Sequence, residues 1–226
     1  MKISVAMTVY NGEKYLAEQL DSIRCQTRQA DEVVICDDIS GDSSAELIRG
    51  YIEKYGLSGS WFFSVNDRNK GYASNFFDAV EKTTGELVFF CDQDDIWLPD
   101  RLERMERVME EHADIQMLGS EFEPFCCSED APTIRREVLE SFHNDGSLEH
   151  VPFTAANVFI GSEGCTMCIR KSFWEQIREY WFPGWAHDEF VWKLSLCLDG
   201  CYIYHKTTLK RRMHAGNVSK RKMRDL

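Results

Sequence analysis

Apolar, β-branched runs alternate with segments of helical periodicity from residue 2 to about residue 122. This alternation predicts strands that return to one sheet through helices, which is typical of a mostly parallel, doubly wound α/β fold. The apolar runs predict strands over residues 3–9, 33–36, 61–65, 86–91 and 115–122. Helical spacing predicts helices over residues 13–25, 45–55, 74–80 and 101–112.

Polar side chains follow each of the first four predicted strands. The carboxyl ends of parallel strands meet at one edge of a sheet, so we expect one crevice to collect these side chains. They are Thr8, Tyr10, Asn11, Asp37, Asp38, Asn66, Asp67, Asp92 and Asp94. The sequence therefore predicts a ligand site at this edge.

The segment after the fourth predicted strand is strongly acidic. Within residues 89–97, Asp92, Asp94 and Asp95 occupy three of four consecutive positions. Carboxylates at this density repel one another, and a divalent cation is a common compensation because hard cations prefer oxygen ligands. A solvated acidic turn is the alternative interpretation, but the position at a strand end favours a cation site. Asp95 is expected to be a loop or cap residue.

Charge and hydropathy narrow the class of protein. The 226 residues carry a formal net charge of -12, from 26 basic and 38 acidic side chains, which argues against a nucleic-acid-binding surface. No apolar stretch reaches the ~18 residues of a membrane span, and the N-terminus has no signal-peptide pattern. We therefore expect a cytoplasmic protein. Basic residues between 220 and 224 fit either a solvated tail or a peripheral contact with the inner face of the membrane.

Cysteine usage indicates a reduced protein. There are nine cysteines, an odd number, and several lie in apolar runs. Cys165 and Cys168 form a single C-x-x-C, whereas zinc frameworks usually show two such pairs. If both residues lay on one strand they would face opposite sides, so we expect no metal between them.

The pattern changes after Pro124. Residues 125–150 are polar and irregular, which predicts a loop or insertion, and aromatic content rises from residue 151 onward. Most of these aromatic side chains are expected in the core, although some fit a platform for the apolar face of a sugar. The glycine-rich signatures of dinucleotide-binding and P-loop proteins are absent, as are the G-x-S-x-G and H-E-x-x-H motifs.

Four ordered motifs between residues 7 and 99 resemble family 2 glycosyltransferases, most closely the rhamnosyltransferase-like members. They are residues 7–16, residues 32–38 with Ser40, residues 69–71 with Asn75, and the acidic run extended by residues 95–99. Beyond residue 124 the resemblance rests on residues 164–167, 187–189 and 212–214 with Asn217.

This resemblance implies a GT-A fold, with a Rossmann-like, mostly parallel central sheet flanked by helices and a mixed C-terminal half. We expect one domain over residues 1–226, in which residues 1–123 bind the nucleotide sugar and residues 124–226 bind the acceptor. Members of the family often continue further, so the end of this chain fits a C-terminal truncation.

The resemblance also implies a donor site that holds Mg²⁺ or Mn²⁺. Asp94 is the expected metal ligand, and Asp92 is expected at the ribose or at metal-bound water. A metal stabilises the negative charge that builds on a leaving diphosphate. The remaining expected donor-site residues are Thr8, Tyr10, Asn11, Asp38, Lys70, Asn75 and Arg212, with His214 as a third metal ligand. For Lys70 and His214, a solvated or structural role is an equal alternative.

Asp188 is the expected catalytic base, with Glu189 as the fallback. Asp188 precedes an apolar helical segment, and from the residues alone a helix cap is the favoured role. The family pattern favours the base, and the positive end of a helix would keep the carboxylate ionised.

These assignments predict an inverting, divalent-metal-dependent transferase that uses a dTDP- or UDP-sugar. The expected acceptor is a saccharide or lipid-linked molecule in the synthesis of a bacterial surface polysaccharide. A sugar-phosphate nucleotidyltransferase is one alternative, but its first loop should be rich in glycine and arginine, and residues 10–13 contain no arginine. A nucleotide-sugar-binding module without turnover is the other.

Overall fold

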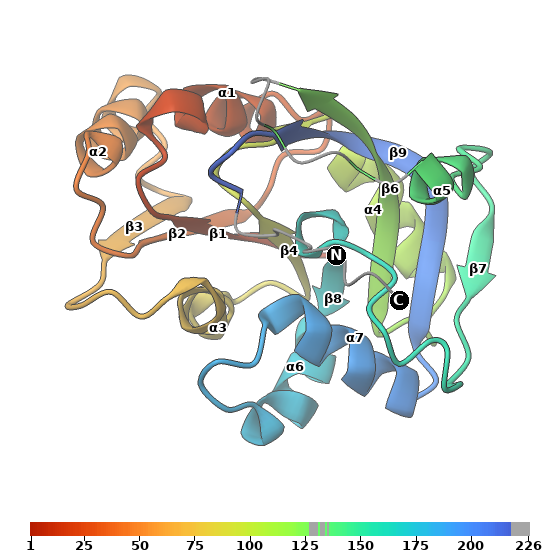
Figure 1. Cartoon of the computed structure of the whole chain (residues 1–226). Helices are drawn as coiled ribbons and strands as arrows, with labels where there is room; N and C mark the ends of the chain where they lie inside the picture. Colours follow the sequence, from red (N-terminus) through yellow and green to blue (C-terminus); the bar gives the residue numbers. More distant parts are fainter. Residues whose placement is uncertain (127–130, 132–133, 135, 218–226) are drawn as a thin grey trace.

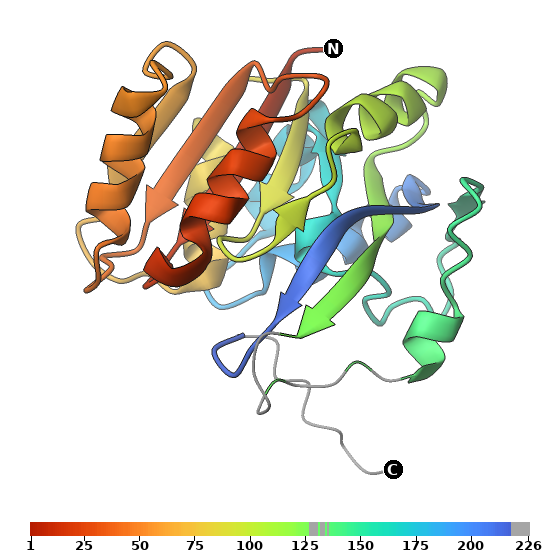
Figure 2. The ribbon, with the colours of Figure 1, turned by 90° about the horizontal axis from the view of Figure 1, so that it is seen from above.

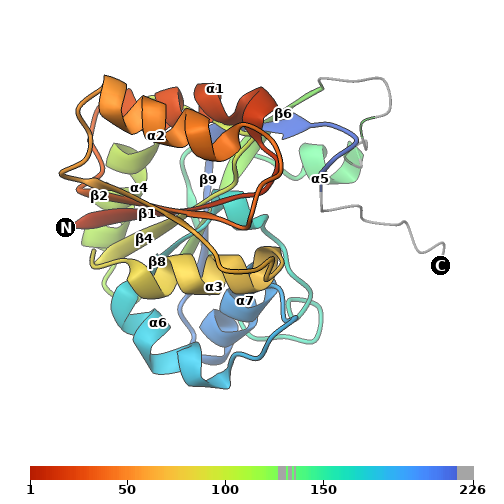
Figure 3. The same ribbon diagram turned by 90° about the vertical axis from the view of Figure 1, so that its left-hand side faces the viewer.

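The computed structural model describes residues 1–126, 131, 134 and 136–217 (Figure 1). Its central sheet has the strand order β3-β2-β1-β4-β8-β6-β9-β5, and β7 pairs with β9 outside this path. Helices lie on both faces of the sheet, with α1 and α2 on one face and α3, α6 and α7 on the other (Figure 3). The predicted doubly wound α/β arrangement is therefore confirmed.

The first half follows the predicted alternation closely. The strands β1 (Ile3–Val9), β2 (Glu32–Asp37), β3 (Trp61–Val65) and β4 (Leu87–Cys91) are parallel to one another. The helices between them are α1 (Glu13–Arg24), α2 (Ser44–Lys54) and α3 (Tyr72–Lys82). Figure 2 shows α1 and α2 lying across the same face of these strands.

Alternate side chains of β1 enter hydrophobic clusters on opposite faces of the sheet. Val5 and Met7 share one cluster with Leu16 of α1, whereas Ala6 shares the other with Phe76 of α3. A strand buried on both faces is expected to read as a continuous apolar run, because it has no solvated side. This burial keeps the carboxyl end of β1 fixed relative to the helices.

The middle of the chain departs from a simple parallel sheet. A two-residue strand, β5 (Ile96–Trp97), precedes α4 (Arg101–Glu111), and β6 covers Met117–Cys126. The predicted fifth strand, 115–122, therefore starts two residues later and ends four residues later. It does not pair with β4, because β8 lies between them and is antiparallel to both.

The second half contains more regular structure than its sequence predicts. The segment expected to be irregular, 125–150, includes the end of β6, α5 (Arg136–Glu140) and β7 (Leu148–His150). The short helix η1 (Gly164–Thr166) and β8 (Cys168–Arg170) follow, then α6 (Lys171–Ile177), η2 (Arg178–Tyr180) and α7 (His187–Cys197). The long strand β9 (Cys201–Met213) pairs with β6 in parallel and with β5 and β7 in antiparallel. No helix in the described part of the chain is long and apolar enough to cross a membrane.

Arg101 joins the two halves beneath the acidic segment. Its side chain is fully buried and donates to the hydroxyls of Ser120 (3.3 Å) and Thr208 and to the carbonyl of Cys165 (2.9 Å). The guanidinium also lies 4.7 Å from the ring centroid of Trp97. Burial lowers the pKa of Arg101 to about 10. One side chain of α4 thus links β6, β9, η1 and β5.

Candidate active site

A cavity of about 500 Å³ opens at the carboxyl ends of β1, β2 and β4. The first turn of α7, the segment around Gly164 and the end of β9 form its other walls. We call this cavity the donor crevice. Eight side chains expected in the site line it, namely Thr8, Tyr10, Asp38, Asn75, Asp92, Asp94, Asp188 and His214. Strand ends together with α3 and the first turn of α7 bring these residues, which span 207 positions from Thr8 to His214, to one place.

Asp38 directly follows β2, lines the donor crevice and binds the neighbouring loop through hydrogen bonds. Its two carboxylate oxygens accept the backbone N–H groups of Lys70 and Gly71, each at 2.8 Å. The side-chain amide of Asn66 also donates to Asp38 (2.8 Å) and to Asn75 (2.9 Å). Asn75 in turn donates to the carbonyl of Cys36 at 2.9 Å. These bonds fix the loop that carries Gly71 against the strand end.

Asn11 and Lys70 lie next to the donor crevice but do not line it, within the described residues. Asn11 adopts a left-handed φ of 50°, and its side-chain oxygen accepts the N–H of Gly41 at 2.7 Å. The Lys70 ammonium pairs with Asp78 of α3 at 2.7 Å, and this hydrogen bond raises its pKa. The side chain of Lys70 is therefore directed toward α3, and its backbone N–H is the group that contacts Asp38.

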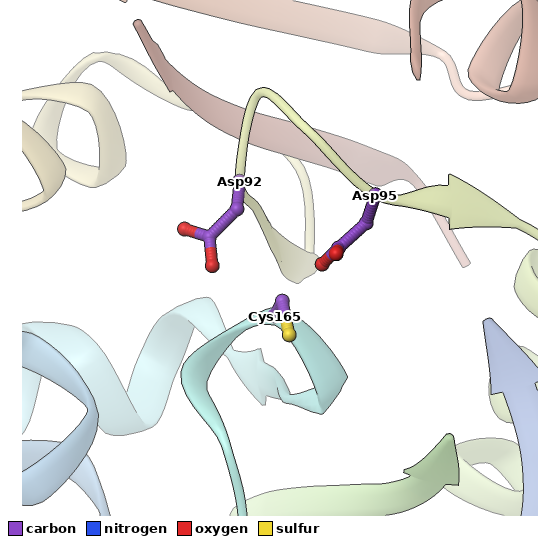
Figure 4. A group of neighbouring side chains, drawn as sticks. All are labelled: Asp92, Asp95 and Cys165. Atoms are coloured by element: carbon purple, nitrogen blue, oxygen red, sulfur yellow. The ribbon is translucent and has the colours of Figure 1, made fainter. Parts of the chain in front are cut away.

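Asp92, Asp95 and Cys165 form a cluster in which Asp92 is partly buried and the other two are buried (Figure 4). One ligand atom of each lies within 4.8 Å of the others, and in Figure 4 the Asp95 carboxylate points toward Cys165. Burial, then the neighbouring charge of Asp94, raises the pKa of Asp92 well above its usual range and that of Asp95 to about 7. Asp95 is only 2% exposed and precedes β5, while the N-cap of α4 is Asp100. Asp95 is thus a buried loop carboxylate and not a helix cap.

Cys165 was not expected in this site. It belongs to η1 and not to a strand, so the premise that Cys165 and Cys168 lie on one strand was wrong. Cys168 is at the start of β8 and takes no part in the cluster, and the two cysteines form no disulfide. Burial raises the pKa of the Cys165 thiol well above its usual range.

Asp94 forms a separate contact with the end of β9. Its Oδ2 lies 2.7 Å from Nε2 of His214 and accepts a weaker bond from Asn217 at 3.4 Å. The cluster whose ligand atoms lie within 4.8 Å of one another does not include Asp94 or His214. The three expected metal ligands therefore fall into two groups. Asp92 belongs to the cluster with Asp95 and Cys165, whereas Asp94 is paired with His214.

The side-chain atoms that could ligate a metal at the acidic segment suit Mg²⁺ or Mn²⁺. Three carboxylates and one imidazole offer mostly oxygen ligands, which hard divalent cations prefer. Oδ2 of Asp95 is buried without a hydrogen-bond partner in the described part of the chain, so no described protein group satisfies this oxygen. The residues present fit a divalent cation on this ground.

Gln93 ties the acidic segment to the first loop. Its side-chain oxygen accepts the N–H of Tyr10 at 2.7 Å, and its side-chain nitrogen donates to the carbonyl of the same residue at 3.0 Å. Gly12 leaves room for this contact, since a Cβ there would lie 2.5 Å from Oε1 of Gln93. Sequence reasoning missed Gln93 because only the aspartates around it carry an evident chemical signal.

Arg211, and not the expected Arg212, lines the donor crevice. Side chains alternate along a strand, so neighbours on β9 face opposite ways. Arg211 pairs with Glu163 at 3.1 Å. Arg212 donates to the carbonyl of Asp94 at 2.7 Å and pairs with Glu18, so it supports the acidic segment from outside.

Asp188 is the second residue of α7 and lines the donor crevice. The N-cap of this helix is Ala186, so Asp188 is not the capping residue. Its Oδ1 accepts the N–H of Glu189 at 2.8 Å, while the Glu189 carboxylate pairs with Lys193 at 2.5 Å. Of these two carboxylates, Glu189 therefore makes a side-chain ion pair, whereas Asp188 makes none with another described residue.

His187 is buried beside Asp188. Its ring lies 3.8 Å from that of Phe76, centroid to centroid, and neither ring nitrogen has a hydrogen-bond partner within the described residues. Burial lowers its pKa, so the imidazole is neutral near pH 7. The sequence singled out His187 only as part of the motif 187–189 and indicated no role for its side chain.

Residues 4–177 match the family model described as glycosyl transferase family 2. The chain belongs to this family. The putative glycosyltransferase EpsE of Bacillus subtilis (strain 168) is 33% identical over 119 residues, which are 53% of this chain and 42% of EpsE. The poly(ribitol-phosphate) beta-N-acetylglucosaminyltransferase TarS of Staphylococcus aureus (strain Mu50 / ATCC 700699) is 33% identical over 114 residues, 50% of this chain and 19% of TarS. The family 2 chain therefore matches these relatives over less than half of their length.

Solved structures of TarS share the fold of this family 2 chain. The structure of S. aureus TarS 1–349 in complex with UDP-GlcNAc superimposes with a TM-score of 0.75 at 21% sequence identity. It covers 96% of this chain and 60% of that one. The GT-A arrangement predicted from the sequence motifs is thus confirmed, whereas the rhamnosyltransferase-like subtype is a finer assignment that the likeness does not test.

Proposed function

We propose that this protein is an inverting, divalent-cation-dependent glycosyltransferase that moves a sugar from a nucleoside diphosphate to a saccharide or lipid-linked acceptor. One observation carries the proposal: the donor crevice brings the acidic segment, Asp38 and Asp188 together in a family 2 fold. The division into a donor half, 1–123, and an acceptor half, 124–226, belongs to the same proposal.

The nucleoside end of the donor is assigned to the crevice around Asp38, Thr8 and Tyr10. The carbonyl and ring nitrogens of a pyrimidine base match the amide and carboxylate groups gathered there. The diphosphate is assigned to the opposite end, beside the acidic segment and Arg211. A guanidinium at this position supplies a permanent positive charge to an anionic leaving group.

Mg²⁺ or Mn²⁺ would be held by Asp94 with His214, and by Asp92 with its buried neighbour Asp95. When bound there, the cation supplies a Lewis acid that neutralises charge on the departing diphosphate. The two hydrogen bonds between Gln93 and Tyr10, and the one from Arg212 to the carbonyl of Asp94, keep this segment in place.

Asp188 is assigned as the base that takes the proton of the acceptor hydroxyl. It lies in the first turn of α7, where the positive helix N-terminus interacts favourably with an acidic side chain. A base within hydrogen-bond reach typically contributes ~10²–10⁴ in rate. No nucleophilic side chain is needed, since a single displacement inverts the anomeric centre directly.

The resemblance of the four motifs between residues 7 and 99 to rhamnosyltransferase-like members makes dTDP- and UDP-sugars the first donors to test. UDP-GlcNAc is the donor bound in a TarS structure. Surface polysaccharide synthesis at the cytoplasmic face of a membrane is the setting proposed for the reaction.

The test is release of nucleoside diphosphate from a donor panel with Mn²⁺ and a saccharide acceptor. We expect Asp188→Asn to lower kcat at least 100-fold, as loss of a general base predicts, while leaving donor binding intact. Asp199→Asn is the matched control, since Asp199 is exposed and lies outside the donor crevice. Equal kcat in Asp188→Asn and wild type would remove Asp188 as the base, and donor binding without product for any acceptor would favour a binding module.

A further inference from the structure

A second cavity, of about 480 Å³, lies beside the donor crevice. We call it the side cavity. It is enclosed by β6, the end of α5, β7, β9 and the segment 160–163. Its lining includes the charged or polar residues Glu121, Ser141, His143, Glu149, Glu163 and His205. The donor chemistry proposed above leaves this cavity without a role.

The side cavity and the donor crevice share a wall. Ile160 and Glu163 line both. Glu163 pairs with Arg211 at 3.1 Å, on the donor side. The next residue, Gly164, packs against the assigned base, because a Cβ placed on it would lie 3.2 Å from Cβ of Asp188. A ligand that extends from the side cavity past this wall therefore arrives beside Asp188.

The charged side chains that line the side cavity favour a sugar over a phosphate as its ligand. Three carboxylates line it, and within the described chain no lysine or arginine does. Glu121 and Glu149 both lie 2.9 Å from a ring nitrogen of His205, so this imidazole is already engaged. The other histidine of the lining, His143, stacks on the His205 ring and carries no permanent charge. A phosphate would meet carboxylates without a free permanent cation, whereas sugar hydroxyls donate readily to carboxylates.

The apolar lining completes the match to a sugar. Phe122 and Phe142 contact each other edge to face, with centroids 5.1 Å apart, and Ile160 and Ile203 lie in the same cavity. Apolar side chains suit the C–H faces of a pyranose, while the side chain of Glu149, which is 57% exposed, offers a hydrogen-bond acceptor.

We propose that the side cavity binds the acceptor and that this acceptor is an uncharged saccharide, not a phosphate polymer. The proposal rests on the glycosyltransferase function proposed above. It separates this chain from the poly(ribitol-phosphate) acceptor in the name of TarS.

The test measures binding, so that it does not depend on turnover. Saturation-transfer NMR is recorded for a panel of neutral methyl glycosides and disaccharides, and for poly(ribitol phosphate), with the UDP-loaded protein. Ser141→Trp fills the side cavity from the exposed residue that follows α5. Glu140→Trp is the matched control, because Glu140 is also exposed but does not line the cavity. Calorimetry with UDP and Mn²⁺ checks the donor crevice in every variant.

We expect at least one neutral saccharide to show saturation transfer that is lost in Ser141→Trp and retained in Glu140→Trp, with unchanged UDP affinity. No signal from any neutral saccharide, or a signal that Ser141→Trp retains, would overturn the proposal. Stronger binding of poly(ribitol phosphate) than of every neutral saccharide would also overturn it. Absence of UDP binding in the wild type would instead count against the proposed function, while the saccharide comparison would still decide the role of the side cavity.

Discussion

Gln93 makes both of its side-chain hydrogen bonds to a single residue, Tyr10. The two bonds tie the acidic segment to the loop after β1, although Gln93 carries no charge and performs no chemistry in the proposed reaction. Its amide is a positioning group: it sets the separation of the aspartates from the nucleoside end of the crevice.

Replacing Gln93 by methionine keeps the length of the side chain and removes both bonds. A typical hydrogen bond contributes ~0.5–1.5 kcal/mol, so we expect the donor KM to rise about tenfold. The kcat should fall less, because Asp188 is untouched. Steady-state kinetics over a donor series tests this, and an unchanged KM in a variant with wild-type melting temperature would show that the bonds do not position the donor.

The residues with intrinsic chemistry were predictable from the sequence, but the direction of their neighbours was not. The aspartates after β2 and β4 lie in the donor crevice because strand ends meet there. Lys70 pairs with Asp78 instead of facing the crevice, and Arg211 takes the place expected for Arg212. Such choices depend on loop course and on the register of β9, neither of which is encoded by local spacing.

At the scale of elements, α4 is held to the sheet through the buried side chain of Arg101. Arg101→Met keeps the apolar stem and leaves the carbonyl of Cys165 without its partner. Removing one member of a buried polar network commonly costs ~3–5 kcal/mol, and we expect a loss of that order in the free energy of unfolding. Urea denaturation measures it, and Arg104→Met is the control because Arg104 is partly exposed. Equal stabilities of the two variants would contradict a structural role for Arg101.

His205 joins β9 to β6 through Glu121 and to β7 through Glu149, each at 2.9 Å. Burial lowers the pKa of His205, but the two carboxylates outweigh it and raise the pKa above its usual 6.5. A raised pKa in the folded state means that this stabilisation is complete below pH 6.5 and is lost as pH rises through the folded value. His143, stacked on the ring at 4.5 Å, is the other titratable group in contact.

We therefore expect the stability difference between wild type and His205→Gln to shrink as pH increases from 6 to 9. Thermal or urea unfolding across this range measures the difference, and His112→Gln on an exposed helix end is the control. A difference that stays constant or grows with pH would contradict the proposed charge state.

Element prediction succeeded where periodicity was long and failed where pairing was distant. Strands β1 to β4 could be predicted because each is a short apolar run of at most seven residues. The helices that follow them could be predicted because their sequences show clear helical spacing. The two residues of β5 give no periodic signal, and β8 is too short to reveal that it separates β4 from β6. Only the partner strands define these elements.

For the whole molecule, the sheet sets the geometry of the proposed reaction. Parallel strands deliver the donor groups to one edge, and the antiparallel insertion of β8 brings η1 and the segment 160–163 against them. The resemblance carried by residues 7–99 was sufficient for the family and the donor edge. The resemblance gave no indication of the side cavity, because β6, β7 and β9 build that cavity from residues distant in sequence.

The central claim is that the acidic segment binds the donor diphosphate through a divalent cation. Calorimetric titration of UDP, with Mn²⁺ and with EDTA, tests it directly in wild type and in Asp94→Ala. We predict that UDP binds the wild type at least tenfold more tightly with Mn²⁺ than with EDTA, and that Asp94→Ala abolishes this difference. UDP affinity that is the same with Mn²⁺ and EDTA in the wild type, or a metal effect that Asp94→Ala leaves unchanged, would contradict the claim.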